Sequence, residues 1–146
     1  MKSPALRAIL LACAVYVVAG VLFGALAGRA ATNDGRVAWR LAAWIVSAIA
    51  FGAQIAYEQV RLRNAPAVTA FHAALAAGLG AFGLAVAANV HAWIATPQRH
   101  PLILKLSLAI WPIITALPAF VVALVAAWLL SRIRHGVSSR HPDNQV

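Results

Sequence analysis

Residues 8–28 read AILLACAVYVVAGVLFGALAG, a run of 21 residues without a charged side chain. A helix needs about 20 consecutive apolar residues to cross the hydrocarbon core of a bilayer. Three further uncharged runs follow at residues 41–57, 64–98 and 106–131. The run at 41–57 has only 17 residues, so a spanning helix there must include Arg40 and Glu58. The sequence therefore predicts an all-α membrane protein with four transmembrane helices.

Prolines and turn residues set the expected ends of these helices. Proline favours the first turn of a helix, and the residue before a proline resists helix, so Pro66 and Pro97 bound the long third run. Asn33-Asp34-Gly35 is a turn signal between the first two runs. We expect helices near residues 5–28, 38–62, 67–95 and 102–131, joined by short connections into an up-down antiparallel bundle. Residues 1–131 then form one transmembrane domain, and residues 132–146 form a flexible, basic cytoplasmic tail.

The composition and the placement of charge indicate a lipid environment. Of the 146 residues, 63% are hydrophobic and 10% are charged, whereas a soluble domain carries about 25% charged residues. The net charge of +9 comes from basic residues at the ends of apolar runs, where they can reach phosphate headgroups. No cluster of basic and aromatic residues forms a nucleic-acid surface. The predicted partner is therefore the lipid bilayer, and no nucleic acid is expected.

Basic residues also predict the orientation in the membrane. Seven Lys and Arg residues fall on the side of the two termini and five on the opposite side. Because cytoplasmic loops carry the excess of positive charge, both termini are expected in the cytoplasm. The first helix has an alternative interpretation as a cleaved signal peptide, since Ala25-Leu26-Ala27 has the form of a cleavage site. Its apolar run is longer than the roughly 7–15 residues of such peptides, which favours a spanning helix.

Small residues mark the predicted helix contacts. Two overlapping G-x-x-x-G units in the first helix let another backbone approach closely, and the third helix is similarly small-sided. Contact inside one bundle and contact between subunits both satisfy this pattern. The expected packing glycines are Gly20, Gly24, Gly28, Gly78, Gly80 and Gly83.

Two other residue types inside the apolar runs have structural interpretations. Pro112 and Pro118 lie inside the fourth helix and are expected to kink it, because each removes a backbone hydrogen bond. The single cysteine, Cys13, allows no intramolecular disulfide and no Cys-x-x-Cys motif. We interpret Cys13 as a small apolar packing residue.

The second helix carries a stripe of polar and aromatic residues. They recur at steps of four and three, so they share one helix face. A stripe of this kind is unfavourable against lipid, and we expect the face to turn inward or toward a partner. Its members are Arg40, Trp44, Ser47, Phe51, Gln54, Glu58 and Arg61.

Glu58 is the only acidic residue in a predicted span, and it defines the candidate site. It lies about 7 Å inside the end of its helix, and His72 lies about 9 Å inside the next, so the two can meet. With Gln54 and Arg61 they form a candidate proton or cation site, because a carboxylate and an imidazole can change protonation near neutral pH. The structural alternative is a packing contact, or pairing of Glu58 with Arg61 one turn on.

The sequence argues against catalysis and against a bound cofactor. It has no zincin, nucleophile-elbow or phosphate-loop motif, so neither an enzyme nor a metal site is expected. Haem would need facing histidines, whereas His72 and His91 are about 28 Å apart along one helix. We expect a noncatalytic subunit or assembly partner of a membrane complex. The alternative is a small oligomeric transporter or channel, linked to protons or cations, that uses Glu58 and His72; a homo-oligomer is compatible with either.

Overall fold

Four long helices make up the computed structural model, which describes residues 3–95 and 101–138. They are α1 (Pro4–Arg29), α2 (Asn33–Val60), α3 (Pro66–Ala95) and α4 (Pro101–Ser138), and no strand occurs within these ranges. Each helix contains a segment long and apolar enough to cross a membrane. The prediction of an all-α chain with four candidate spanning helices is confirmed, and it indicates a multi-pass membrane protein.

Hydroxyl side chains cap the first two helices. Ser3 Oγ accepts a hydrogen bond from Leu6 N at 3.2 Å, and Thr32 Oγ1 accepts one from Gly35 N at 3.1 Å. Asp34 lies in the first turn of α2, where a negative charge is favourable at the helix N-terminus. Asn33-Asp34-Gly35 therefore begins α2 instead of forming a turn before it. The helix starts five residues earlier than the expected residue 38 because Thr32 caps it.

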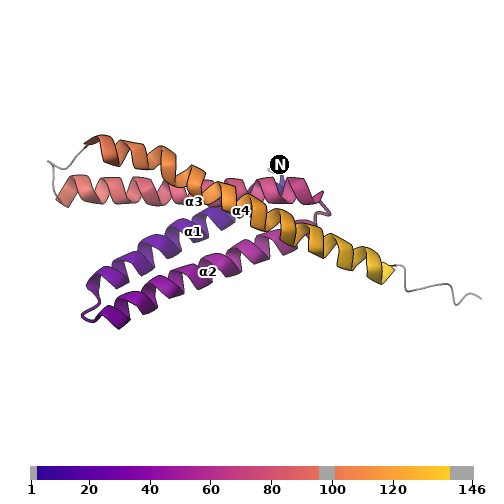
Figure 1. Cartoon of the computed structure of the whole chain (residues 1–146), viewed down its shortest axis with the longest axis horizontal. Helices are drawn as coiled ribbons and strands as arrows, with labels where there is room; N and C mark the ends of the chain where they lie inside the picture. Colours follow the sequence, from indigo (N-terminus) through magenta and orange to yellow (C-terminus); the bar gives the residue numbers. More distant parts are fainter. Residues whose placement is uncertain (1–2, 96–100, 139–146) are drawn as a thin grey trace, which may run out of the picture.

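The fourth helix is longer than expected. It continues to Ser138, past the expected end at residue 131, because no proline follows position 118 until Pro142. Residues 139–146 of the expected tail lie outside the described residues. Pro112 and Pro118 lie inside α4 without ending it. The helix follows α3 as far as Ala123 and Ala127, which pack with Ala70 and Ala73 near the start of α3, and its C-terminal end extends beyond α3 (Figure 1).

The helices pack as two hairpins that cross. In Figure 1 the chain reverses direction at each connection, and the α1–α2 hairpin diverges from α3 and α4 toward its own turn. Helix α3 packs mainly against α4 and also against α1, whereas α2 touches α3 and α4 only lightly. Within the described residues α1 and α4 make no contact. Helix α3 thus joins the two hairpins, while their up-down arrangement across a bilayer stays a prediction.

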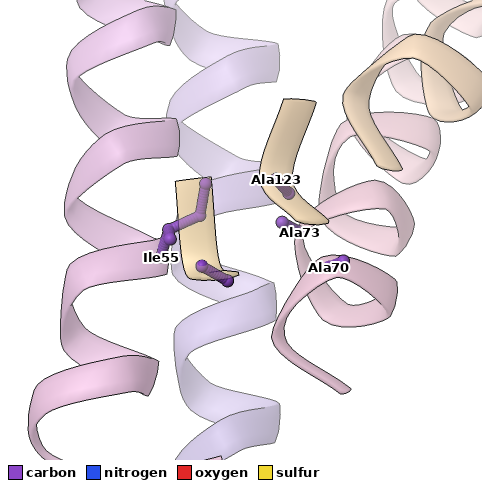
Figure 2. Packing of buried hydrophobic residues seen from close by; sticks show 5 residues of the cluster. Ile55, Ala70, Ala73 and Ala123 are labelled. Atoms are coloured by element: carbon purple, nitrogen blue, oxygen red, sulfur yellow. The ribbon is translucent and has the colours of Figure 1, made fainter. Parts of the chain in front are cut away.

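Alanines build the core where the hairpins cross. Ile55 of α2 lies against Ala70 and Ala73 of α3 and against Ala123 of α4, close to the α2–α3 connection (Figure 2). Side chains of this size let helix backbones approach closely, which is the main source of helix association in lipid. Most large apolar side chains elsewhere are exposed, as a lipid-facing surface requires.

Three of the predicted packing glycines lie in α3 and face other helices. A Cβ built on Gly80 would lie 2.8 Å from Tyr16 Cβ, and one on Gly83 would lie 2.7 Å from Val17 Cγ2, so both face α1. A Cβ on Gly78 would lie 3.3 Å from the nearest side chain of α4. These positions therefore permit the close approach of α3 to both neighbours.

Candidate functional site

Glu58 lies in the last turn of α2 and is 0% exposed. Five residues connect α2 to α3, and Arg63 adopts a positive φ of 52°, which lets this short connection reverse the chain. The backbone nitrogen of Asn64 donates to the carbonyl oxygen of Glu58 at 3.2 Å. The connection thereby folds back over the end of α2 and brings the first turns of α3 beside Glu58.

Three side chains meet the carboxylate of Glu58. Gln54 Nε2 donates to Oε1 at 3.3 Å, and Asn64 Nδ2 donates to Oε2 at 3.0 Å. A hydrogen bond of 2.7 Å joins His72 Nδ1 to the same Oε2. The partners come from α2, from the connection and from α3, so one buried group ties three consecutive segments together.

A second set of hydrogen bonds supports the connection. Gln59 Nε2 donates to the carbonyl oxygen of Asn64 at 3.2 Å and to Thr69 Oγ1 at 2.8 Å. Gln59 and Thr69 are both buried. Sequence reasoning missed Gln59, Asn64 and Thr69, because none lies on the polar stripe of α2. They could have been found from their position, because all three are polar and lie close in sequence to Glu58 or Pro66, where a buried carboxylate needs hydrogen-bond partners.

Arg61 does not join the site. Among the described residues, the contact at ion-pair distance joins Glu58 Oε2 to His72 Nδ1, at 2.7 Å. Arg61 is exposed at the C-cap of α2, where a long basic side chain can extend to headgroups. Of the predicted site residues, the structure therefore brings together Gln54, Glu58 and His72.

The geometry of this cluster allows two chemical roles. As a structural unit, the carboxylate accepts from Gln54 of α2 and from Asn64 of the connection, and these hydrogen bonds fix the path of the connection. As a binding unit, a carboxylate and an imidazole in hydrogen-bond contact offer polar atoms to a proton or a cation inside the membrane. The side chain of His72 is 21% exposed, which leaves the pair in contact with its surroundings. No group of three His, Cys, Asp or Glu side chains in the described ranges is placed to hold a metal ion.

The polar stripe of α2 turns inward only in its C-terminal half. Gln54 and Glu58 are buried, whereas Trp44 is 75% exposed and Arg40 is also exposed. The cause is the divergence of the α1–α2 hairpin from α3 and α4 (Figure 1). The expectation that the whole face is covered is met within this chain only near the α2–α3 connection.

The glycine row of α1 divides in the same way. A Cβ on Gly20 would lie 2.5 Å from Leu84 Cδ2 of α3, so Gly20 is closely packed. Gly24 and Gly28 have no atom of another segment within 4 Å of a built Cβ, and both are exposed. Within the described part of this chain these two glycines pack against nothing.

The chain matches no family model, and no curated protein or solved structure is significantly similar to it. The interpretation of the cluster and of the open glycine face therefore depends on their geometry.

Proposed function

We propose that this chain is a noncatalytic subunit or assembly partner of a membrane complex, and that Gly24 and Gly28 form its contact face. The observation that supports the proposal is the open space at these two glycines, on a row whose first member, Gly20, is closely packed. G-x-x-x-G spacing lets a second helix approach closely, and van der Waals packing of this kind drives helix association in lipid. A helix of a partner subunit or of a second copy fits this face.

The exposed part of the α2 stripe supports the same proposal. Trp44 lies about 16 Å from the start of α2, well inside a hydrocarbon core about 30 Å thick, and is 75% exposed. Aromatic anchors at the membrane surface lie closer to helix ends. Contact with another protein would cover Trp44, and it would also cover Arg40 one turn away.

In this proposal the Glu58 cluster has a structural role. Its hydrogen bonds hold the α2–α3 connection and join the two hairpins at the end where they cross. The hairpins can then diverge at the other end without separating, which exposes the contact face. The cluster thus contributes to assembly by holding the hairpins in the arrangement that leaves Gly24 and Gly28 open to a partner.

A glycine substitution tests the contact face. Leucine at Gly24 has room within the chain and should leave thermal stability unchanged or slightly higher, since glycine is about 1 kcal/mol less favourable than ordinary residues inside a helix. The same change should remove the partner or second copy and reduce the particle size on a native gel after mild solubilisation. Gly52→Leu on α2 is the matched control, because Gly52 is equally open. An unchanged particle size in Gly24→Leu would contradict the proposal.

We place the helices in an up-down arrangement with both termini cytoplasmic and residues 132–146 as a basic cytoplasmic tail. The excess of basic residues on the side of the termini supports this orientation. Arg132 Cζ lies 3.8 Å from the ring centroid of Trp128, a pairing that suits the interface at the end of α4. In a Cys13→Ala background, Asp34→Cys should react only from outside and Ser138→Cys only from the cytoplasm. Labelling of both from one side would refute the arrangement.

The second candidate function is proton- or cation-linked transport by a small oligomer. The observation that favours it is the 2.7 Å contact between His72 and Glu58, with Arg61 placed outside the pair. Purified chain in liposomes under a pH gradient provides the test. Flux that vanishes in Glu58→Gln but persists in Arg61→Gln, with stability kept, would support transport. Absence of flux in the wild-type chain, with Glu58→Gln only destabilised, would favour the subunit.

A further inference from the structure

A groove of about 490 Å³ lies between the N-terminal half of α1 and the C-terminal half of α2. Alanine, leucine, valine and proline form most of its wall, and its polar lining residues are Arg7, Gln54 and Tyr57. It is separate from the open glycine face, which lies at the other end of α1. Nothing in the proposed subunit function uses this groove.

The dimensions of the groove match one lipid chain. It extends along α1 from Pro4 to Val15, about 16 Å at 1.5 Å per residue, and one leaflet of the hydrocarbon core is about 15 Å thick. A volume of about 490 Å³ over that length gives a mean cross-section of about 30 Å². The groove is therefore long and narrow, as an extended acyl chain requires.

The groove has positive charge at one end, where Arg7 lies, and an apolar wall along the rest of its length. Helix α1 has 26 residues and is about 39 Å long, so about 4–5 Å extends beyond the core at each end. Arg7 lies one turn into α1 and therefore at the boundary where lipid phosphates lie. The ion pair among the described residues is Glu58 with His72, so Arg7 has no acidic partner there. The N-terminus of α1, which Ser3 caps, adds the partial positive charge of the helix dipole.

We propose that this groove binds one phospholipid with an anionic headgroup. Its phosphate lies against Arg7 and the N-terminus of α1, and one acyl chain follows Ala8, Leu11 and Val15 into the membrane. Gln54 is neutral, and its amide nitrogen already donates to Glu58, so Arg7 is the charged residue among those that line the groove. A free phosphate would meet only the polar end and leave the apolar length of the groove empty.

Lipid titration of the full chain in mild detergent, read by native mass spectrometry, tests the charge. Phosphatidylglycerol should bind to one site more tightly than phosphatidylcholine. Arg7→Gln should weaken phosphatidylglycerol binding at least about tenfold, the loss expected for a charged hydrogen bond. The matched control is Arg29→Gln, which removes the same charge from the other exposed end of α1. Equal binding by these two variants, or equal binding of the two lipids, would overturn the proposal.

A filled groove tests the acyl chain. Ala53 lines the groove and is exposed, so Ala53→Phe should block it and abolish the one-site adduct. Ala48→Phe, at an exposed position of α2 outside the groove, should have no effect. Retention of the adduct in Ala53→Phe, or its displacement by millimolar inorganic phosphate, would show that no lipid chain occupies the groove. Helical circular dichroism of each variant separates loss of binding from loss of fold, and the Arg7→Gln comparison stands if Ala53→Phe does not fold.

Discussion

Replacing Glu58 with alanine should lower the free energy of unfolding strongly, because it removes an acceptor that three side chains share. The side chain is 0% exposed, and its carboxylate is in hydrogen-bond contact with Gln54, Asn64 and His72. These partners belong to α2, to the connection and to α3. Removal of the carboxylate therefore loosens the end of the molecule where the hairpins cross.

The magnitude follows from what the change leaves behind. A buried donor without an acceptor costs about 1–3 kcal/mol, and among the three partners only Gln54 is buried. The lost hydrogen bond between the carboxylate and His72, which is partly exposed, adds about 1.5–3 kcal/mol. We expect Glu58→Ala to cost about 3–5 kcal/mol in total. Glu58→Gln should cost about 1–3 kcal/mol, because the amide oxygen still accepts from one of the donors.

A double-mutant cycle separates the ion pair from ordinary packing. Glu58→Ala, His72→Ala and the double variant are unfolded reversibly from mild detergent by sodium dodecyl sulfate, with tryptophan fluorescence as the signal. A hydrogen bond to a charged group predicts a coupling of about 1.5–3 kcal/mol between the two positions. Neutral hydrogen bonds between membrane helices average about 0.6 kcal/mol. A coupling at or below that value would refute the ion-pair interpretation.

Three further substitutions test other parts of the fold by the same unfolding measurement. Gly20→Leu should lower the free energy of unfolding by about 1–3 kcal/mol, because the new side chain meets Leu84, and an unchanged value would mean that α1 and α3 do not pack there. Tyr16→Phe should raise it by about 1 kcal/mol, because the buried hydroxyl has no hydrogen-bond partner among the described residues; a loss would reveal one. Thr32→Ala should lower it by about 1 kcal/mol through loss of the α2 cap, and no change would show that the cap is replaceable.

The four helices could be predicted because uncharged runs of this length have few other stable states in a bilayer. The ends of the helices were harder to predict, because the same residues can form either a turn or the first turn of a helix. Asn33-Asp34-Gly35 fits a turn and also fits the first turn of a capped helix, and Thr32 decides for the helix. The end of α4 was similarly hard to predict, because the basic residues after position 131 are compatible with both a helix and a tail, and the helix continues to Ser138.

The meeting of Glu58 and His72 was accessible to sequence reasoning, because rise per residue and a short connection give each its depth. The role of Asn64 and the exclusion of Arg61 could not be predicted in this way. Asn64 reaches the carboxylate only because the connection reverses at Arg63 with a positive φ, a path that no spacing rule supplies. Exclusion of Arg61 likewise depends on where α2 ends.

The glycine row shows a different limit. Gly20, Gly24 and Gly28 have the same spacing and belong to one row, yet only Gly20 packs against α3. The difference arises from the divergence of the two hairpins, seen in Figure 1. Spacing within one helix carries no information on the angle at which a second helix crosses it.

Photocrosslinking beside the open glycine face, in the native membrane, tests the proposed assembly role most directly. A photoreactive residue at Val21, exposed one turn before Gly24, should give one protein adduct of defined mass, either a second copy or a single partner. The adduct should disappear when Gly24→Leu is added, and the same residue at exposed Ile49 of α2 should not produce it. Only lipid adducts at Val21, or a protein adduct that Gly24→Leu leaves unchanged, would contradict the proposal that Gly24 and Gly28 form the contact face of a membrane subunit.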